Sequence, residues 1–324
     1  MRDKIFSLLH DLGIPQILRM VQVGRRQLSI LMFHRVSDVP DPLWPPLPTK
    51  TFFALIRELS RKATVVALER IDEIEEYPQK PLVALSFDDG YGDFYDNAVP
   101  ILDEFGVPAH HNICPGLIDR KTLPWTQVLG ELLWINRSGN ILLPDGERIQ
   151  VGNEIDEAFL LRVAGKLYGL NDELREDWIN VIREQILLPA DKKLMGWEQI
   201  RECADANIHI GSHGMNHRNI SMIGSRHILV EEVVESKKKI GKMVGVDPAI
   251  FAFPNGLYTK QSTEIVKSSG YKVALLCEDR TVPYIALQGN SFMALPRISI
   301  SKKNWKEENL RSLGFHQSLL FWKG

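Results

Sequence analysis

Apolar runs of strand length alternate with stretches of helical periodicity along most of the 324-residue chain. The runs at 28–33 (LSILMF) and 82–87 (LVALSF) are almost entirely apolar, which is typical of strands buried on both faces of a parallel sheet. Further strands are predicted at 107–115, 208–213, 249–254, 271–277 and 291–300, and helices at 52–62, 96–106, 196–207, 225–245 and 259–270. This alternation predicts a parallel α/β sheet, either open and doubly wound or closed into a barrel.

The segment 117–194 interrupts the alternation and is interpreted as an insertion. Residues 123–139 and 154–189 have helical character, whereas 140–151 consists of two short runs around an Asp-Gly pair, which predicts a hairpin. We therefore expect a mostly helical insertion with one hairpin.

The first 27 residues carry an apolar stripe with helical spacing. The stripe consists of Ile5, Phe6, Leu8, Leu9 and Leu12, continued beyond Pro15 by Ile17, Leu18 and Val21. A helix packed on its own domain is one interpretation, and a helix lying on a membrane surface, aided by Arg19, Arg25 and Arg26, is the other. Charged residues interrupt the stripe in a way that does not match a signal peptide, so we expect a cytoplasmic protein, with peripheral contact at the inner membrane surface as the alternative.

Composition and motifs argue against several classes of protein, including nucleic-acid-binding, disulfide-rich and nucleotide-binding proteins. The chain is 44% apolar and 25% charged, an ordinary globular balance, and its formal net charge of -2 offers no field that would attract nucleic acid. Cys114, Cys203 and Cys277 lie far apart in no metal-binding spacing, so we expect buried thiols rather than a disulfide framework. Neither a GxGxxG fingerprint nor a phosphate-binding loop is present, which weakens nucleotide-binding interpretations.

Polar side chains gather where the predicted strands end. Asp88 and Asp89 follow the strand at 82–87, and His213 and His217 follow the strand that begins at residue 208. Because the carboxyl ends of parallel strands meet at one edge of a sheet, we expect these side chains to converge. Two histidines and one aspartate suit a catalytic divalent metal. Such an ion would relieve the repulsion between adjacent carboxylates and leave the second carboxylate to accept a proton from water.

The chain resembles the polysaccharide deacetylases of the NodB-homology type, carbohydrate esterase family four. The matching motifs are SFDDGY (86–91), SHGMNH (212–217) and FAFPNGLY (251–258), with ILMFHRV (30–36) and LPRISI (295–300) resembling the first and last strands of one branch. The resemblance implies a distorted (β/α) barrel with about seven parallel strands. The implied organisation is an amphipathic helical segment at 1–27, a barrel at 28–116 and 195–310, the insertion at 117–194 and a tail at 311–324.

The resemblance also implies an activity. Asp89, His213 and His217 would hold one divalent metal, usually Zn²⁺, although this ligand set also accepts Co²⁺, Ni²⁺ or Mn²⁺. Asp88 would be the general base, and the backbone N–H of Tyr91 would stabilise the oxyanion. The substrate class is an N-acetylated amino sugar in a polysaccharide, an oligosaccharide or a lipid-linked glycan intermediate, and the products would be acetate and a free amine.

Two positions depart from the family pattern. Gly214 stands where the family usually has Ser or Thr, and Ala252 stands where an arginine often orients the base. We expect Arg297 to hold Asp88 instead, through a charge-assisted ion pair.

The family's late histidine acid has no counterpart in ALPRISI, so the proton donor is open. One of His110 and His111 must point inward, because neighbouring strand residues alternate, and His110 is the candidate for a replacement acid or a substrate contact. His34 is a second candidate. Pro254, Asn255 and Tyr258 are expected to contact substrate together with His34. Two alternatives remain: hydrolysis of another amide, such as a formamide or a cyclic amide, on the same site, and a catalytically impaired glycan-binding barrel, which the two departures would favour.

Overall fold

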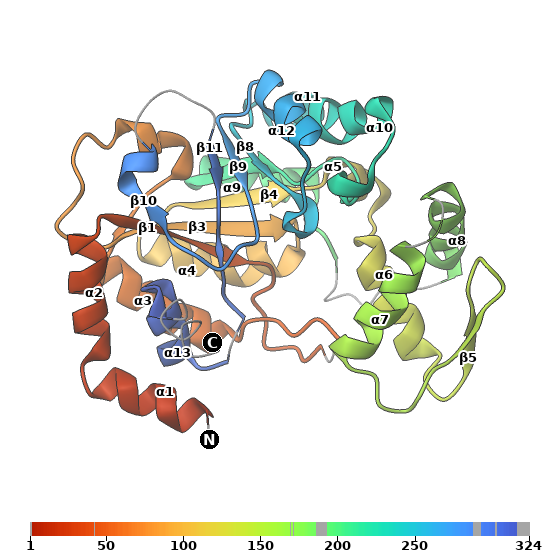
Figure 1. Cartoon of the computed structure of the whole chain (residues 1–324), viewed down its shortest axis with the longest axis horizontal. Helices are drawn as coiled ribbons and strands as arrows, with labels where there is room; N and C mark the ends of the chain where they lie inside the picture. The colour runs from red at the N-terminus through yellow and green to blue at the C-terminus, as the bar shows by residue number, and fades with distance from the viewer. Residues whose placement is uncertain are drawn as a thin grey trace.

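The parallel strands form a nearly closed barrel (Figure 1). The computed structural model describes residues 2–41, 43–168, 170, 172–185, 193–287, 293–301 and 303–315. In spatial order the strands are β1 (Gln27–Phe33), β3 (Leu82–Asp89), β4 (Ala109–Ile113), β7 (Ile208–Ser212), β8 (Ile250–Ala252), β9 (Val273–Leu275) and β11 (Met293–Leu295). Each neighbouring pair is parallel, and after β11 the chain returns to the first strand, where β12 (Ile298–Ser299) pairs in parallel with β1. The predicted distorted barrel with about seven parallel strands is confirmed.

Two short strands extend this sheet beside the ring. β2 (Thr64–Val65) pairs in parallel with β3, and β10 (Val282–Pro283) pairs antiparallel with the first residues of β1. β10 and β12 therefore pair with different parts of the same edge of β1, so the sheet is irregular where its last strands meet its first strand.

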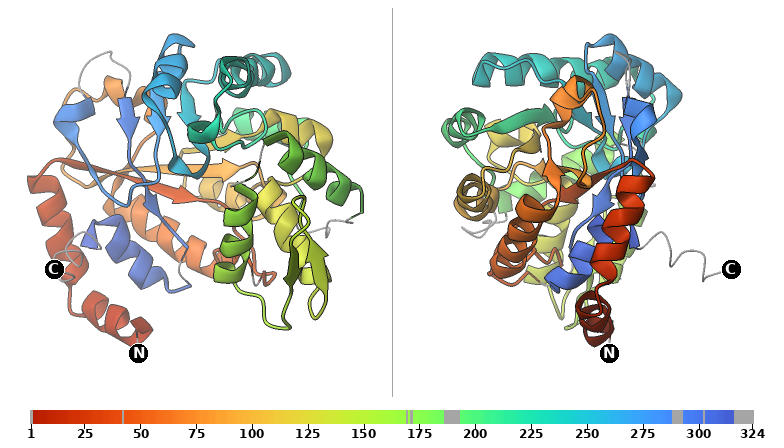
Figure 2. Two further views of the ribbon diagram at one scale, coloured as in Figure 1. Left: turned by 45° about the vertical axis from the view of Figure 1, so that its right-hand side comes forward. Right: turned by 90° about the vertical axis from the view of Figure 1, so that its left-hand side faces the viewer.

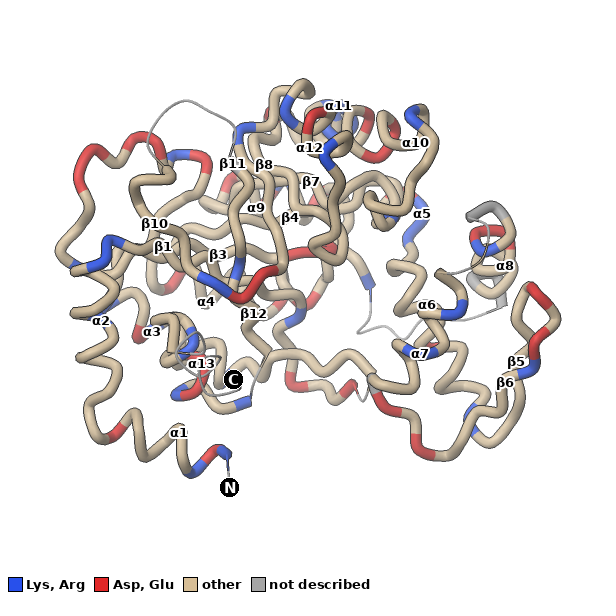
Figure 3. Tube along the Cα trace, viewed as in Figure 1, with Lys and Arg blue, Asp and Glu red and all other residues tan. Residues whose placement is uncertain are grey.

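Helices cover the outside of the barrel (Figure 2). They include α3 (Thr49–Lys62), α4 (Val99–Glu104), α9 (Trp197–Asp205), α10 (Arg226–Val230), α11 (Ser236–Val244) and α12 (Lys260–Ser268). Short helical turns lie in the connections between these elements: η1 (Leu68–Glu73), η2 (Phe94–Ala98), η4 (Ile220–Met222), η6 (Pro254–Gly256) and η7 (Tyr284–Leu287). The single long helix predicted at 225–245 is interrupted, because a π-helical turn, η5 (Glu231–Glu235), joins α10 to α11. Acidic and basic positions are interspersed along the described trace (Figure 3).

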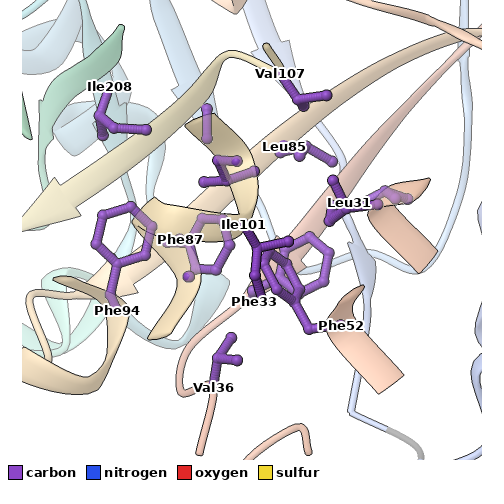
Figure 4. Packing of buried hydrophobic residues seen from close by; sticks show 14 of the residues in the cluster. Leu31, Phe33, Val36, Phe52, Leu85, Phe87, Phe94, Ile101, Val107 and Ile208 are labelled. Atoms are coloured by element: carbon purple, nitrogen blue, oxygen red, sulfur yellow. The ribbon is translucent and has the colours of Figure 1, made fainter. Parts of the chain in front are cut away.

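Aromatic packing outside the barrel fixes which way β3 faces. Phe87 stacks on Phe33 of β1 at 4.8 Å between ring centroids and contacts Phe52 of α3 and Phe94 of η2 (Figure 4). Because neighbouring strand residues point to opposite faces, the outward position of Phe87 turns Asp88 into the barrel. All eight residues of β3 are buried, so its terminal carboxylates sit in a dry environment.

The insertion lies at the end of the barrel where the strands finish (Figures 1 and 2). Its elements are α6 (Trp125–Ile135), the hairpin strands β5 (Asn140–Leu142) and β6 (Arg148–Gln150), α7 (Glu157–Tyr168) and α8 (Asp172–Gln185). The preceding α5 (Pro115–Arg120) begins before residue 117 and contacts α11 of the barrel. The predicted hairpin and helices are therefore present, and residues 186–192 lie outside the described part. Trp125 packs edge-on against Tyr168 inside a separate apolar core of the insertion.

The N-terminal segment forms two helices, α1 (Arg2–Asp11) and α2 (Ile14–Gly24), which lie against α13 (Trp305–Ser312). Phe6 is buried, whereas several apolar side chains of the predicted stripe are exposed: Ile5, Leu8, Leu12, Ile17 and Val21. None of the helices in the described residues combines the length and the apolar character that crossing a membrane requires. α13 runs past residue 311, where the tail was predicted to begin, and residues 316–324 lie outside the described part.

The three cysteines are free thiols. Cys114 and Cys203 are buried as expected, but Cys277 is exposed, which corrects the expectation of three buried thiols. Cys277 follows β9, where the chain leaves the packed sheet at the barrel mouth.

Candidate metal and catalytic site

Three potential metal ligands converge at the carboxyl ends of β3 and β7. The Asp89 Oδ1 atom lies 3.5 Å from His213 Nε2 and 3.4 Å from His217 Nε2. The ligand atoms of all three residues lie within 4.8 Å of one another, and all three side chains are buried. Two distant segments of the chain thus place one oxygen and two nitrogens around a common point.

The donor set fits a bound cation. Ligands about 2.1 Å from a tetrahedral zinc ion are separated from each other by about 3.4 Å, close to both oxygen-to-nitrogen distances found here. Asp89 Oδ1 is buried and has no hydrogen-bond partner among the described residues. Burial raises the pKa of Asp89, the expected penalty for a carboxylate that lacks a compensating charge. A divalent ion would supply that charge.

Backbone contacts orient the histidine ligands. His213 Nδ1 lies 2.8 Å from the carbonyl oxygen of Ala252, so a proton on Nδ1 donates there and Nε2 keeps its lone pair for a metal. Ala252, the position without the family's arginine, therefore serves through its carbonyl group. Burial lowers the pKa of both His213 and His217 to about 4, which keeps both imidazoles neutral near pH 7.

Asp88 occupies a different environment from Asp89. Its Oδ1 atom accepts a hydrogen bond of 2.8 Å from Arg297 Nη1, and its Oδ2 atom forms an ion pair of 2.8 Å with Nη2 of the same, fully buried guanidinium. Burial alone would raise the pKa of Asp88, but the charge of Arg297 outweighs it and holds that pKa far below its usual range. The expected ion pair is present, and Asp88 stays ionised. Asp88 Oδ2 lies 3.9 Å from His213 Nε2, beside the ligand set.

The structure corrects the position expected for His110. His110 points into the barrel, but its Nε2 accepts a hydrogen bond from the Leu68 N–H at 2.8 Å and its ring stacks on His209 at 5.0 Å. Asn112, one inward-facing position further along β4, is the residue that donates to Asp88 Oδ1, at 2.8 Å. Alternation along the strand gave the correct face of β4, but the depth along the barrel depends on the register with β3.

The turn after Asp89 is held from both sides. Asp89 and Gly90 adopt positive φ values of 77° and 88°, which ends β3 abruptly. The Gly90 N–H donates to His111 Nε2 at 3.0 Å. The Gly92 N–H donates to the carbonyl oxygen of Lys193, and the Met195 N–H donates to the carbonyl oxygen of Gly90, so these two bonds flank Tyr91. Within the described residues, no hydrogen bond from the Tyr91 N–H is found. That N–H is therefore available to a substrate oxygen.

Glu232 explains the absence of a hydroxyl at position 214. This buried residue of the π-helical turn accepts hydrogen bonds from the backbone N–H and the side-chain amide of Asn216, each at 3.0 Å. Gly214 has a φ of 80°, and a Cβ atom there would lie 2.7 Å from Glu232 Oε2. The Glu232 carboxylate thus fills the space next to Gly214 and braces the loop between His213 and His217.

This packing yields a stability prediction. Gly214→Ala is expected to lower the free energy of unfolding by about 1–3 kcal/mol and to weaken metal binding, because it combines a strained φ with a clash against Glu232. Denaturant unfolding and metal titration would measure both effects. Gly224→Ala is the matched control, since a Cβ at Gly224 meets no atom within 4 Å and its φ is not positive. Equal behaviour of the two variants would contradict the proposed brace.

The expected substrate residues surround the same mouth. His34 follows β1 and packs edge-on against Trp44 at 5.6 Å between ring centroids. Of the third motif, Pro254 is buried and Asn255 donates to the Tyr168 hydroxyl at 3.3 Å, so this motif touches the insertion. Tyr258 is exposed beside Phe253.

Several supporting residues were missed from the sequence. Arg35 is buried between Asp93, at 2.7 Å, and Asp41, at 3.0 Å, and its guanidinium lies over the Tyr91 ring. Gln127 of α6 is close enough to Asp89 to influence its pKa. Arg35 lies two residues after the strand predicted at 28–33, and this position at a strand end could have identified it as a candidate site residue. Gln127 lies within a helical segment of the insertion, and nothing local in the sequence distinguishes it.

Comparisons with known proteins identify the family and similar folds. The family described as polysaccharide deacetylase matches residues 75–274. A Bacillus subtilis (strain 168) protein named "Putative polysaccharide deacetylase YxkH" is 20% identical over 279 residues, which cover 85% of this chain and 72% of that protein. The Streptococcus pyogenes deacetylase PplD, solved with acetate, is similar in fold with a TM-score of 0.58, 19% identity and coverage of 88% of this chain and 96% of that one. IcaB from Ammonifex degensii gives a TM-score of 0.58 at 15% identity, with coverage of 89% and 97%.

Proposed function

The chain belongs to the polysaccharide deacetylase family, and from that premise we propose that it removes the acetyl group from an N-acetylated amino sugar in a glycan by metal-dependent hydrolysis. The observation that carries the proposal is the division of labour between neighbouring carboxylates. Asp89 presents an unpaired oxygen to two histidine nitrogens, whereas Asp88 is held by Arg297 just outside the ligand set. One carboxylate is thus suited to hold a cation and the other to move a proton.

The proposed mechanism assigns a role to each of these residues. Asp89, His213 and His217 would hold one divalent ion, most simply Zn²⁺, which supplies Lewis-acid polarisation of the amide carbonyl and acidifies water. Asp88 accepts the proton of the attacking water as general base. Arg297 keeps Asp88 ionised and fixes its orientation, because both of its terminal nitrogens bond to that carboxylate.

Two further groups complete the proposed reaction. The Tyr91 N–H donates to the carbonyl oxygen as negative charge develops on it, which is usually a large catalytic contribution. His34, which follows β1 at the barrel mouth, is the proposed donor of a proton to the leaving nitrogen. The C–N bond breaks, and acetate and a free amine leave. Arg297 pairs with Asp88 although Ala252 lacks the family's arginine, and the Glu232 carboxylate lies in the space beside Gly214, which supports an active enzyme over an impaired barrel.

A metal-reconstitution assay tests this proposal. Protein stripped with a chelator and reloaded separately with Zn²⁺, Co²⁺, Ni²⁺ or Mn²⁺ is expected to release acetate and free amine in equal amounts from N-acetylglucosamine oligosaccharides. The stripped protein should release neither. N-formyl substrates in parallel distinguish a deformylase through formate release. No product from any substrate with any metal would contradict the assignment.

We also propose a cytoplasmic location with peripheral membrane contact through α1 and α2. The support is the row of exposed apolar side chains on these two helices, together with the exposed Arg25 and Arg26 at their end. Co-sedimentation with anionic lipid vesicles is the test. Replacing Leu8, Leu12 and Ile17 with Ser should abolish sedimentation, and unchanged sedimentation would reject the contact.

A further inference from the structure

An apolar cavity of about 430 Å³ lies between the insertion and the mouth of the barrel. Helices α6 and α7 of the insertion form one wall, and barrel loops form the other. Its apolar side chains include Leu43, Trp44, Leu123, Leu160, Leu161 and Leu257. The proposed reaction uses none of these side chains, so their grouping at this place calls for a ligand of its own.

The cavity is much larger than an acetyl group requires. The volume of about 430 Å³ falls within the range of roughly 300–1,000 Å³ that is usual for pockets holding a whole small molecule. A methyl group occupies about the volume of one water molecule, roughly 30 Å³. Polar side chains such as Gln127, Glu131 and Asn219 also line the cavity, but a sugar ring packed against its leucine side chains would lose hydrogen bonds to water there. A hydrocarbon chain matches both the size and the chemistry.

The cavity adjoins the candidate metal site without including it. Tyr91 and Asn255 line the cavity, and Trp44, which packs on His34, lines it too. Asp88 and the three candidate metal ligands are absent from its lining. In the proposed reaction the acyl carbon lies between these absent residues and the Tyr91 N–H, and its methyl group needs no cavity of this size, whereas a chain carried by the sugar can extend past Tyr91 into the cavity. The position therefore favours a chain on the glycosidic side of the amino sugar.

The entrance to the cavity is apolar as well. Leu161 and Leu257 line the cavity from opposite walls and remain 58% and 49% exposed, and Met222 beside them is also exposed. Solvent-exposed apolar side chains that gather at the opening of an apolar pocket mark a binding surface rather than ordinary surface scatter. An amphiphile can enter here with its chain against these residues and its sugar toward the metal site.

We propose that this cavity binds the hydrocarbon chain of a glycolipid, so that the substrate is an N-acetylated amino sugar carrying a lipid at its glycosidic position. The inference rests on the proposed deacetylase function for the reaction, but the binding of the chain is a separate property. It predicts that affinity rises with chain length on the glycosidic oxygen and not with chain length on the nitrogen.

Calorimetric binding to the metal-loaded full chain tests this inference. The ligands are methyl, hexyl and octyl N-acetylglucosaminides below their micelle concentrations, and methyl N-octanoylglucosaminide. The octyl glycoside is expected to bind about 10–100-fold more tightly than the methyl glycoside, from burial of its methylenes. Leu161→Asp and Leu257→Asp should bring that ratio close to one. Leu142→Asp, at a position 55% exposed and outside the cavity lining, should leave it unchanged.

The outcomes are separable from those of the deacetylase assay. Equal affinity for methyl and octyl glycosides overturns the glycolipid inference even if acetate is released. A gain only for the N-octanoyl ligand also overturns it, in favour of an acyl-chain pocket. A chain-length gain that the two cavity variants remove supports the inference even if no amide is hydrolysed, and in that case the proposed reaction fails alone.

Discussion

Asp88→Asn is expected to lower kcat by about 10²–10⁴-fold while the protein keeps its bound metal. The amide cannot accept a proton from water, whereas Asp89, His213 and His217 are unchanged as ligands. Steady-state deacetylation together with metal analysis of the purified variant would measure both quantities. Because the pKa of Asp88 lies far below its usual range, the wild-type base is ionised throughout the neutral and mildly acidic range.

The control for this variant must also be a buried aspartate paired with arginine. Asp93→Asn fits, because Asp93 is buried and bonds to Arg35 at 2.7 Å but lies outside the ligand set. We expect Asp93→Asn to lose stability with kcat changing less than about tenfold, since the control touches no proposed reacting atom. A drop of less than tenfold in Asp88→Asn with metal retained would remove Asp88 from the role of base.

The sequence predicted the fold and the convergence of strand ends because both depend on local patterns. Alternating apolar runs and helical segments identify parallel strands, and parallel strands bring their carboxyl ends together. Asp88, Asp89 and the two histidines each follow a predicted strand, so their meeting required no knowledge of side-chain packing.

Residues that act across the fold were harder to predict. His110 was assigned to the correct face of β4, but the pairing of Asp88 with Asn112, rather than with His110, depends on the register between two strands. Glu232 reaches Gly214 from a helix beyond the histidine loop, at a π-helical turn. Apolar periodicity alone marks neither the register nor that turn, so the partner of Gly214 could not be identified from its own neighbourhood.

The insertion illustrates the same limit. Its helices and hairpin were predicted from periodicity and an Asp-Gly turn, yet its position over the barrel mouth follows from tertiary contacts such as Asn255 with Tyr168. The helical periodicity of 123–139 and 154–189 does not show which face of these helices packs as core and which lines a cavity. Only the arrangement in space shows that α6 and α7 line a cavity beside the candidate site.

Arg297→Met is expected to destabilise the metal-free protein by about 3–5 kcal/mol at pH 7. The substitution leaves the Asp88 carboxylate buried without its cation, whereas wild-type Arg297 bonds to both carboxylate oxygens. Denaturant unfolding in the presence of a chelator is the measurement, so that metal binding does not contribute. Arg297→Lys, which keeps the charge but not the two-pronged contact, should fall between wild type and Arg297→Met.

The sign of the pH dependence follows from the depressed pKa of Asp88. A carboxylate whose pKa is lower in the folded state contributes stability above its unfolded pKa of about 3.9 and loses that contribution as the pH falls further. In Arg297→Met the pKa of Asp88 rises, so Asp88 becomes protonated and neutral at a higher pH. The stability gap between wild type and variant should therefore narrow from pH 7 toward pH 4, and the acidic limb of kcat should move to higher pH.

A double variant separates the lost ion pair from simple loss of packing. If the cost of Arg297→Met is mainly an uncompensated charge, then adding Asp88→Asn removes that charge and should recover part of the stability. If the cost comes from lost packing around the fully buried arginine, the second substitution should only lower stability further. Additive losses at pH 7 would thus show that Arg297 acts by filling space, and its assignment as the residue that keeps Asp88 ionised would fall.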